Sequence, residues 1–532
     1  YVGDASVYLF GKNGEAPNDS ILYKNLNIHY YDKLQVRPNM LYRWMNYQQF
    51  VRSKQMRASN RTRLYSQYRQ EQVQEKLSQL GIFSYMDMQY APRDTTAACD
   101  TLDVTMQATF AKPLDAELEL NVVTKSNDQT GPGASFGVTR NNVFGGGESW
   151  NVKLKGSYEW QTGGGEKSSL MNSWEMGLST SLTFPRVVFP HLGKREFDFP
   201  ATTTFRLYIN QLNRAKYYKL LSFGGNATYD FQPSRTSRHS ITPFKLTFNV
   251  LQHQSEDFKE IAEANPALYV SLRNQFIPAM EYTYTYDNAS GRRIKNPIWW
   301  QSTVTSAGNI TSLIYRAFGK PFNEEDKSLL GAPFAQFVKL NTELRHLWNI
   351  DKNNAIASRM AVGALFTYGN ATIAPYSEQF YVGGANSIRA FTVRSVGPGG
   401  YHPEEGKYSY LDQTGTFRFE ANVEYRFRIF KSFWGATFLD AGNVWLLRKD
   451  RKLLADGKEA RPNSQLRLKT FPKQIALGTG VGIRYDMDIL VFRLDFGIPL
   501  HLPYDTERSG YYNVTGAFFK NLGIHFAIGY PF

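Results

Sequence analysis

The stretch Phe380–Gly400, FYVGGANSIRAFTVRSVGPGG, carries the residues of this sequence that are best suited to specific polar chemistry. A strand is expected to end at Gly383 and Gly384, and a long loop with Arg389 and Arg394 follows. An arginine keeps its charge at physiological pH, and its planar guanidinium forms paired hydrogen bonds with a carboxylate. The chemistry predicted for this loop is therefore ion pairing with acidic side chains elsewhere in the chain.

The same loop is less polar than its length suggests. A long surface loop is usually polar and mobile, but this one contains Ile388, Phe391 and Val393. The run Gly397-Pro398-Gly399 gives a sharp bend that other residue types would not permit. We therefore expect the loop to pack against the rest of the protein.

Motifs of enzymes and metal sites are weak in this sequence. The run 163–168, GGGEKS, lacks the Gly-Lys-Ser ending of a phosphate loop, and 478–482, GTGVG, has no helix after it. The acidic run 324–326 lacks the spaced oxygen ligands of a calcium loop. The histidines form no His-Glu-x-x-His pair, and the single cysteine, Cys99, suits a passive role. The sequence predicts no enzyme, no metal site and no cofactor.

Most of the chain alternates with period 2. In Glu148–Trp160, ESWNVKLKGSYEW, Trp150 and Tyr158 point to one side, while Lys153 and Lys155 point to the other. Strands of about eleven residues with aromatic ends are typical of tilted strands that cross a bilayer. The lysines on the opposite face place part of the positive charge inside a barrel.

The pattern recurs about sixteen times between residues 130 and 532, and an even number is typical of bacterial outer-membrane barrels. The expected strands begin near 134–141, include one at 376–383, and end near 521–532. The breaks 384–414, 446–473 and 500–520 are long, as expected of external loops. The segments 254–274 and 310–332 look partly helical and, by this count, fall on the periplasmic side. The sequence thus predicts a transmembrane antiparallel β-barrel of about sixteen strands.

The composition fits a barrel as well. The chain has 532 residues with 15% aromatic residues and a net charge of +14, and its apolar runs are shorter than the ~18 residues of a membrane-spanning helix. We attribute the positive charge to a lumen and rims that face acidic lipid head groups and lipopolysaccharide, and we expect no nucleic-acid partner. Because the chain opens at Tyr1 without a signal-like region, we expect a mature or trimmed form.

The first part of the chain has a different texture. Strands are expected at 22–31, 82–90 and 101–110, and helices at 38–50 and 66–80. Val73, Leu77 and Leu80 form one apolar face of the second helix. We expect a small α+β domain at 21–116, the tail of a preceding copy at 1–20, and the barrel at 130–532.

Two segments resemble a known family. FYVGGANSIRAF, residues 380–391, resembles the signature of the BamA/TamA superfamily of outer-membrane protein assembly factors (bacterial surface antigen type), in which a loop with an Arg-Gly-Phe or Arg-Gly-Tyr tip folds back into the barrel. Arg389 and Phe391 match that tip, but Ala390 stands where the family has glycine, so its conformation should differ. QEQVQEKLSQLGIF, residues 70–83, resembles part of a POTRA domain. The form of the tip is similar to TamA-like proteins of the Bacteroidota.

The resemblance implies a partner for the loop arginine. Glu424 and Asp440 stand in segments that resemble the family strands that meet the loop inside the lumen. We expect Arg389 to bond Asp440, with Glu424 nearby, because an unpaired buried charge is costly. The alternative is that the three residues are separately solvated charges in the lumen.

The chain terminus resembles the last strand of outer-membrane barrels. In Gly523–Phe532, the side chains of Phe526, Ile528, Tyr530 and Phe532 are expected to alternate outward. Pro531 donates no ladder hydrogen bond, so pairing with the first strand, at Phe136, Gly137 and Val138, should be weak. A weak seam would open and pair with a client strand; the alternative is an ordinary closed seam.

The function that follows is assembly or insertion of other outer-membrane proteins. The expected partners are unfolded outer-membrane clients, periplasmic or lipoprotein subunits at the POTRA-like domain, and outer-membrane lipid. The N-terminal domain is expected in the periplasm of a Gram-negative cell. The alternative is a two-partner secretion pore that exports one dedicated protein; a passive porin would have no use for the front domain or the loop of Arg389.

Overall fold

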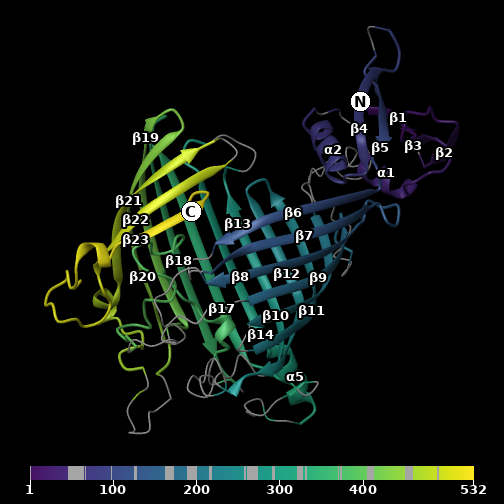
Figure 1. Cartoon of the computed structure of the whole chain (residues 1–532). Coiled ribbons are helices and arrows are strands. Elements are labelled where there is room, and N and C mark those ends of the chain that lie inside the picture. The colour runs from purple at the N-terminus through teal and green to yellow at the C-terminus, as the bar shows by residue number, and fades with distance from the viewer. Residues whose placement is uncertain are drawn as a thin grey trace, which may run out of the picture. The chain divides into compact units, whose positions relative to one another are not determined.

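The structure is a computed structural model of the 532-residue chain (Figure 1). It describes all residues except 1, 25, 46–64, 66, 97–98, 125–128, 162–172, 189–200, 215–217, 257–258, 260–273, 290–293, 320, 322–327, 330–331, 370, 372–373, 404–412, 450–458, 460 and 488–489. The expected helix end at 46–50, the runs 163–168 and 324–326, and most of the segment 254–274 lie outside the described residues.

The described elements follow in chain order. In the first part they are β1 (Val2–Phe10), β2 (Asp19–Tyr23), β3 (Leu26–Tyr30), α1 (Pro38–Met45), α2 (Gln67–Gln79), β4 (Phe83–Pro92) and β5 (Leu102–Phe110). The later strands are β6 (Leu114–Thr124), β7 (Gln129–Asn141), β8 (Ser149–Gln161), β9 (Ser173–Phe184), β10 (Ala201–Arg214), β11 (Tyr218–Ser234), β12 (Ser237–Gln254), β13 (Gln275–Asp287), β14 (Ile298–Ala307), β15 (Ser328–Leu329), β16 (Ala332–Pro333), β17 (Phe337–Asn349), β18 (Asn354–Thr367), β19 (Phe417–Phe430), β20 (Phe433–Trp445), β21 (Ala476–Asp486), β22 (Val491–His501) and β23 (Gly523–Ile528). Between them lie α5 (Asn309–Ala317) and the short 3-10 helices η2 (Tyr376–Glu378), η4 (Phe471–Gln474) and η5 (Phe518–Lys520).

In its described residues, the N-terminal domain has a five-stranded sheet with the order β2-β3-β1-β5-β4 and two helices. Its core contains the expected apolar face of α2, where Val73, Leu77 and Leu80 are buried, together with Val7 and Met106 from the sheet. A helix with one apolar stripe buries that stripe against the sheet, and this accounts for the α+β arrangement.

The beginning of the chain differs from our expectation. Residues 1–20 are expected to be the tail of a preceding domain, but β1 lies in the middle of this sheet and pairs in parallel with β3 and β5. Val7 and Leu9 of β1 are fully buried in the core. The segment expected as one strand, 22–31, belongs to a hairpin of β2 and β3. The reason is that the isolated strand carries no sign in the sequence of which sheet it joins.

The second part of the described chain contains a sheet of sixteen strands, ordered from β23 to β17 and then from β14 to β6. The fold class expected from the sequence is confirmed in this respect. The described helices include none that combines the length and apolar character needed to cross a membrane. In the sheet order, β6 and β23 are the two edge strands.

The expected strand count is right, but one expected strand is wrong and one strand of the sheet was missed. The segment Leu114–Thr124, LDAELELNVVT, forms β6 of this sheet, so the expected barrel start at 130 is too late. Its leucines alternate with acidic residues, and most of the segment falls between the expected soluble domain, 21–116, and the expected barrel, 130–532. The segment 376–383 contains η2 and a single bridge between Phe380 and Gly415 instead of a strand. The two errors leave the number of strands unchanged. They do change which end of the sheet each connection between β6 and β18 is expected to occupy.

With the strands as the structure has them, short and long connections between strands lie at opposite ends of the sheet. From β11 onward, each strand is antiparallel to the next strand of the sheet. The connections at one end are 235–236, 288–297, 350–353, 431–432 and 487–490. Those at the other end are 255–274, 308–336, 368–416, 446–475 and 502–522. The connections that contain 254–274 and 310–332 are therefore at the same end as the long connections expected to be external, and not at the opposite end where the sequence count placed them.

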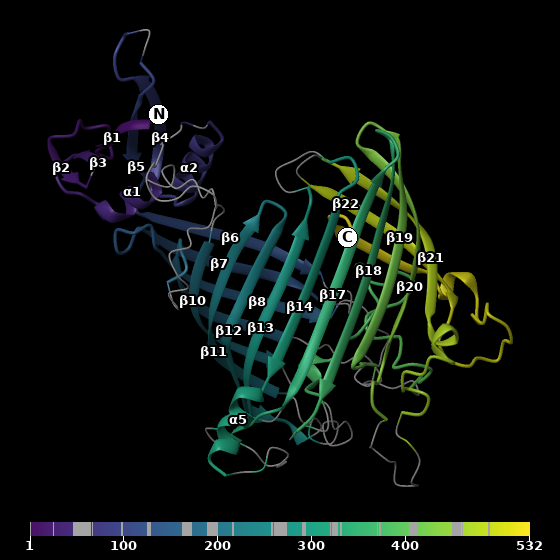
Figure 2. The ribbon, with the colours of Figure 1, turned by 180° about the vertical axis from the view of Figure 1, so that it is seen from behind.

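Strands β18 to β22 have one buried face and one more accessible face. In β19, Glu424 and Arg426 are buried, whereas Val423 and Tyr425 between them are exposed. Opposite directions of successive side chains produce this alternation. We call the buried side the network face and the other the apolar face. Figure 2 shows these strands side by side from behind.

Candidate functional site

The connection between β18 and β19 packs against the network face of the last strands. Within it, the backbone N–H of Gly384 donates to the carbonyl of Phe391 at 2.7 Å, which closes a compact turn around the tip. Ile388, Ala390 and Phe391 are buried in one apolar cluster. The apolar residues that make this loop unusual in sequence therefore form its contact with the sheet.

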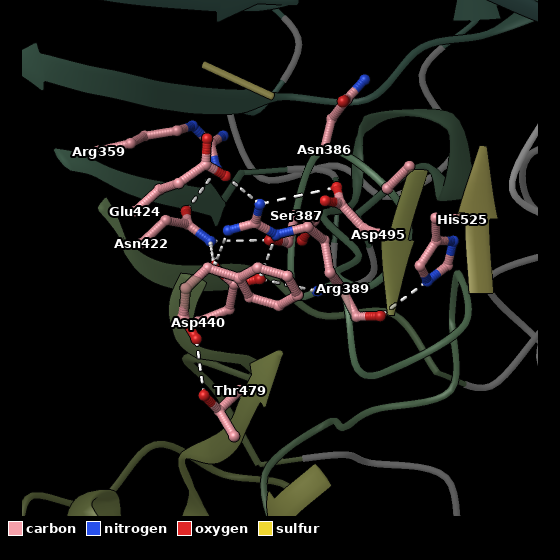
Figure 3. Close-up of polar contacts among 12 residues, drawn as sticks. Arg359, Asn386, Ser387, Arg389, Asn422, Glu424, Asp440, Thr479, Asp495 and His525 are labelled. Atoms are coloured by element: carbon pink, nitrogen blue, oxygen red, sulfur yellow. Dashed lines mark hydrogen bonds and ion pairs between the residues drawn. The ribbon is translucent and has the colours of Figure 1, made fainter. Parts of the chain in front are cut away.

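Arg389 is fully buried and bonds Asp440 through three nitrogen atoms. Its backbone N–H, Nε and Nη2 donate to the Asp440 carboxylate at 3.0, 2.8 and 2.9 Å. The guanidinium carbon lies 3.5 Å from the ring centroid of Phe438, so the guanidinium forms a cation–π contact with this ring. Two side-chain bonds to one carboxylate fix the direction of the guanidinium as well as its position (Figure 3).

Glu424 is shared by three arginines. It accepts hydrogen bonds from Nη1 of Arg389, from Nε of Arg426 at 2.8 Å and from Nη2 of Arg484 at 3.0 Å. Arg484 also forms an ion pair with Asp495 at 2.6 Å. All of these side chains are buried, so each charge depends on its partners for compensation.

A second chain of contacts reaches the loop from β18. The side-chain amide of Asn422 donates to Asp440 at 2.9 Å and to the carbonyl of Ser387 at 2.8 Å. Arg359 donates to Asn422 and to Glu420, both at 3.1 Å. The hydroxyl of Ser387 donates to Glu420 at 2.7 Å. Asn422 and Glu420 of β19, the latter supported by Arg359 of β18, therefore hold the loop before its tip.

Strand register explains why these groups meet. Glu424 is opposite Phe438, which is opposite Gly480, and the row continues through Gly497 to Gly523. A carboxylate, a flat ring and three glycines thus stand side by side on five strands. Glu424 and Phe438 contact the guanidinium of Arg389. The missing side chains at Gly497 and Gly523 leave space for the loop backbone next to the last two strands.

That room is filled by the loop tip. A Cβ added to Gly478 would overlap the Cβ of Ala390, and a Cβ added to Gly497 would lie 2.7 Å from the carbonyl oxygen of Arg389. At Gly523 the distance to the same oxygen would be 3.2 Å. Side chains at these positions would push the tip away from the sheet.

The tip needs no left-handed backbone at Ala390. Among the described non-glycine residues with positive φ, the loop contributes Arg394 at 58°, not Ala390. The positive φ angles of the loop glycines are 100° at Gly383, 94° at Gly384, 84° at Gly397 and 59° at Gly399, and the Gly397-Pro398 bond is cis. Alanine is therefore accommodated without strain, and its methyl group fits over Gly478.

The last strand is bound to the loop as well as to its neighbour. His525 of β23 hydrogen-bonds through Nε2 to the carbonyl oxygen of Arg389 at 2.7 Å. The ladder between β22 and β23 contains six residue pairs, from Phe492–Ile528 to Gly497–Gly523. Phe526 is exposed on the apolar face, as expected.

The end of the chain departs from the expected strand. β23 ends at Ile528, and Gly529 turns with φ of 85°. The guanidinium of Arg426 then lies 4.2 Å from the ring centroid of Tyr530 and 5.8 Å from that of Phe532. It also donates to the carbonyl of Phe532 at 3.3 Å. The expected outward alternation beyond residue 528 is therefore wrong: Pro531 and the positive φ end the strand, and Arg426 holds the aromatic residues.

The expected first strand of the seam is also displaced. Phe136, Gly137 and Val138 lie in β7, which stands one strand in from the edge in the sheet order. The edge strand is β6. The error has the same cause as the late start of the barrel, because most of β6 lies between the expected soluble domain and the expected barrel.

One further motif in the sequence has the spacing of a nucleophile elbow. Residues 133–137, GASFG, follow the pattern Gly-x-Ser-x-Gly, but they lie inside β7 and not on a strand-to-helix turn. The hydroxyl of Ser135 donates to Glu119 at 3.1 Å. Among the described residues, no group of His, Cys, Asp and Glu could hold a metal ion. The geometry supports ion pairing and positioning at the loop, and we find no arrangement for catalysis among the described residues.

Sequence reasoning missed several members of the network: Asn422, Arg484, Arg493, Asp495 and His525. Arg493 donates to the carbonyl of Ala385 at 2.9 Å and to Asn386 at 2.6 Å. A signal was present, since Arg493 and Asp495 stand at alternating positions with Gly497 on one face of β22. Charged residues in register with glycines on one strand face indicate a buried contact.

Comparison with known proteins relates this geometry to a family. The family profile described as Omp85 superfamily domain matches residues 142–532. Among solved structures, BamA from Haemophilus ducreyi lacking POTRA domains 1–3 aligns with a TM-score of 0.56 at 13% identity, over 96% of this chain and 88% of that one. CdiB from Acinetobacter baumannii has a TM-score of 0.45 at 12% identity over 83% of this chain and 66% of that one. CdiB from Escherichia coli has 0.42 at 12% over 99% and 89%. The similarity to BamA shows a shared fold.

Removal of the loop arginine should destabilise the protein far more than removal of an exposed one. In Arg389→Ala, Asp440 and Glu424 lose a buried partner, so we expect a loss of about 3–5 kcal/mol in the free energy of unfolding. Arg238→Ala is the control, because Arg238 is exposed and lies 3.6 Å from Asp230; its loss should stay below ~1 kcal/mol. Urea unfolding in detergent measures both. Equal losses would contradict the buried network.

A methyl group under the tip should release the loop. Gly497→Ala places Cβ 2.7 Å from a backbone oxygen that is fixed by its own bonds, and overpacking of this kind costs about 1–3 kcal/mol. We expect faster trypsin cleavage after Arg389 and Arg394. Gly156→Ala is the control, because its Cβ would meet nothing within 4 Å. Identical cleavage rates in the two variants would show that the tip does not depend on the glycine row.

Proposed function

The chain belongs to the Omp85 superfamily, whose β-barrels reside in the outer membrane and handle protein substrates, and from this membership we propose that it assembles or inserts other outer-membrane proteins. The proposed mechanism is strand templating at the seam between the first and last strands of the sheet. It is not an enzyme in this proposal and requires no cofactor. Its clients are unfolded outer-membrane proteins.

The short ladder of the last strand carries the proposal. β22 spans Val491–His501, but its pairing with β23 covers only 492–497 and 523–528. Past residue 528, Gly529 still donates its backbone N–H to the carbonyl of Val491 at 2.7 Å, and the chain then turns to Arg426. The residues of β22 that have no partner on β23 are 498–501, at the other end of the ladder. A strand edge with unpaired backbone groups accepts another strand by β-augmentation. The last strand is therefore the part of the sheet that is easiest to displace.

The loop contributes by holding this strand. Arg389 accepts the hydrogen bond of His525 on its carbonyl and shares Glu424 with Arg426, which holds the chain end. Displacement of β23 would break the bond to His525 and disturb the contacts of Arg426. The loop network thus supports a seam that stays ordered until a client replaces these contacts.

The first strand offers the opposite edge. In β6, Leu118 and Leu120 are exposed and alternate with Glu117 and Glu119. This period-2 pattern is that of a strand with one apolar face, and the sheet order leaves one side of β6 without a neighbour in the described chain. We propose that a client strand pairs with β6, not with the Phe136–Val138 segment that the sequence suggested.

The N-terminal domain is proposed to be a POTRA-like docking domain in the periplasm. Its sheet ends in the edge strands β2 and β4, and such edges bind extended segments of partners. Periplasmic or lipoprotein subunits are the partners proposed for this domain. The lipid and lipopolysaccharide of the outer membrane surround the barrel in this proposal.

Photocrosslinking tests which strand receives the client. A photoreactive amino acid at Leu118 of β6 should form crosslinks to a newly synthesised outer-membrane protein during its assembly in cells. The same amino acid at Phe136 of β7 is the matched control, because both side chains are exposed but only β6 is an edge strand. Stronger client crosslinks from Phe136 would contradict templating at β6.

A charge exchange tests the loop in cells depleted of the native protein. Arg389→Glu and Asp440→Arg should each lower the levels of outer-membrane proteins several-fold, because each places like charges together in a buried site. The double variant should restore part of the levels. If client levels stay normal in all three while one exported protein disappears from the medium, the assembly proposal fails and the secretion pore replaces it.

A further inference from the structure

Helix α5 lies at the end of the sheet that carries the long connections. It joins β14 to β17 and begins directly after Gly308, whose φ is 70°. A Cβ on Gly308 would lie 2.6 Å from the carbonyl oxygen of Ala335, so the helix starts in close contact with the chain that leads to β17. Figures 1 and 2 both show α5 just beyond the strand ends.

The burial of α5 is the reverse of that in a helix on a water-soluble protein. Its buried residues are Thr311 and Ser312. Its exposed residues are apolar, with exposed fractions of 44% at Ile310, 59% at Leu313, 51% at Ile314 and 84% at the following Phe318. These positions have the spacing i, i+3, i+4 and i+8, so they lie on one face of the helix.

Such a face requires a cover other than water. A surface helix normally turns its apolar stripe to the protein and its polar side to solvent. Four large apolar side chains on one exposed face form a contiguous apolar patch, which in a soluble protein marks an interaction site. The protein side of α5 is occupied by the small polar residues Thr311 and Ser312.

The apolar face of the neighbouring strands indicates what this cover is. Tyr282, Val304 and Leu340 are opposite one another on β13, β14 and β17, and all three are exposed. Closer to α5, Met280 and Phe366 are exposed on the same side. In an outer-membrane barrel, this face is the one that meets lipid. The chain passes from Val304 to Ile310 within six residues, so the patch on α5 continues the lipid-facing surface.

We propose that α5 is an interfacial helix that lies in the membrane leaflet next to the long connections. Its apolar face, formed by Ile310, Leu313, Ile314 and Phe318, contacts lipid acyl chains. Arg316 is exposed beside this face in the last turn of the helix and meets the phosphate groups of the lipid heads. A helix with this pattern is buried about 5–10 Å into the boundary between head groups and acyl chains.

The inference rests on membership of an outer-membrane family and not on the proposed assembly function. It assigns α5 a role in fixing the depth of this side of the barrel in the membrane. Movement of the barrel along the membrane normal would take the apolar face of this helix out of the boundary between head groups and acyl chains. A helix parallel to the membrane surface opposes that movement.

Fluorescence quenching in vesicles tests the position of α5. In the full-length chain with Cys99→Ser, an environment-sensitive label is attached at Leu313→Cys or, as the control on the same helix, at Arg316→Cys. Each protein is reconstituted in phosphatidylcholine vesicles that contain a lipid with a nitroxide near the head of its acyl chain. The Leu313 label should be quenched several-fold more strongly by this lipid than the Arg316 label, and several-fold less by aqueous iodide.

Two results would overturn the proposal. Equal quenching of both labels by iodide would place α5 in water. If neither quencher reaches the Leu313 label, the face is covered by protein, either a second copy or a segment of this chain. Heat-modifiable mobility in gels shows whether each labelled protein is folded, and a Phe318→Cys label provides a second position on the same face.

Discussion

The burial of one guanidinium is the constraint on which the arrangement of the last five strands depends. Arg389 has no access to water, so its charge must be matched by Asp440 and Glu424 at hydrogen-bond distance. Those carboxylates in turn require Asn422, Arg426 and other partners, since a half-satisfied polar network is worse than an apolar core. The loop and the sheet are therefore specified together.

The opposite requirement, empty space, comes from glycine. A loop backbone approaches strands closely only where side chains are missing, and Gly478, Gly497 and Gly523 supply that space in neighbouring strands. A large residue at any of them would separate Arg389 from its carboxylates. Charge and space thus act at the same place, and Ala390 is compatible with this arrangement because Gly478 lies beneath it.

Much of the fold could be predicted from alternation, because period 2 is a local property of each strand. The alternation did not give every strand of the sheet: most of β6 lies between the expected soluble domain and the expected barrel, and 376–383 contains a single bridge where a strand is expected. Arg389, Glu424 and Asp440 could be found from a resemblance, whereas Arg484, Asp495 and His525 could not. Their roles depend on register between strands, which a single sequence does not contain. The segment of α5 looks helical in the sequence, but only its packing in the fold shows which face is exposed.

The sharing of Glu424 has a thermodynamic consequence. Because Arg389 at the loop and Arg426 at the chain end bond the same carboxylate, the two contacts are linked, and linkage is reciprocal. If release of the loop changes the equilibrium constant for detachment of the chain end by some factor, then detachment of the chain end changes the equilibrium constant for release of the loop by the same factor. A ligand that binds only the detached end would therefore be detected at the loop tip, without touching it, as a change in the free energy of its bound state.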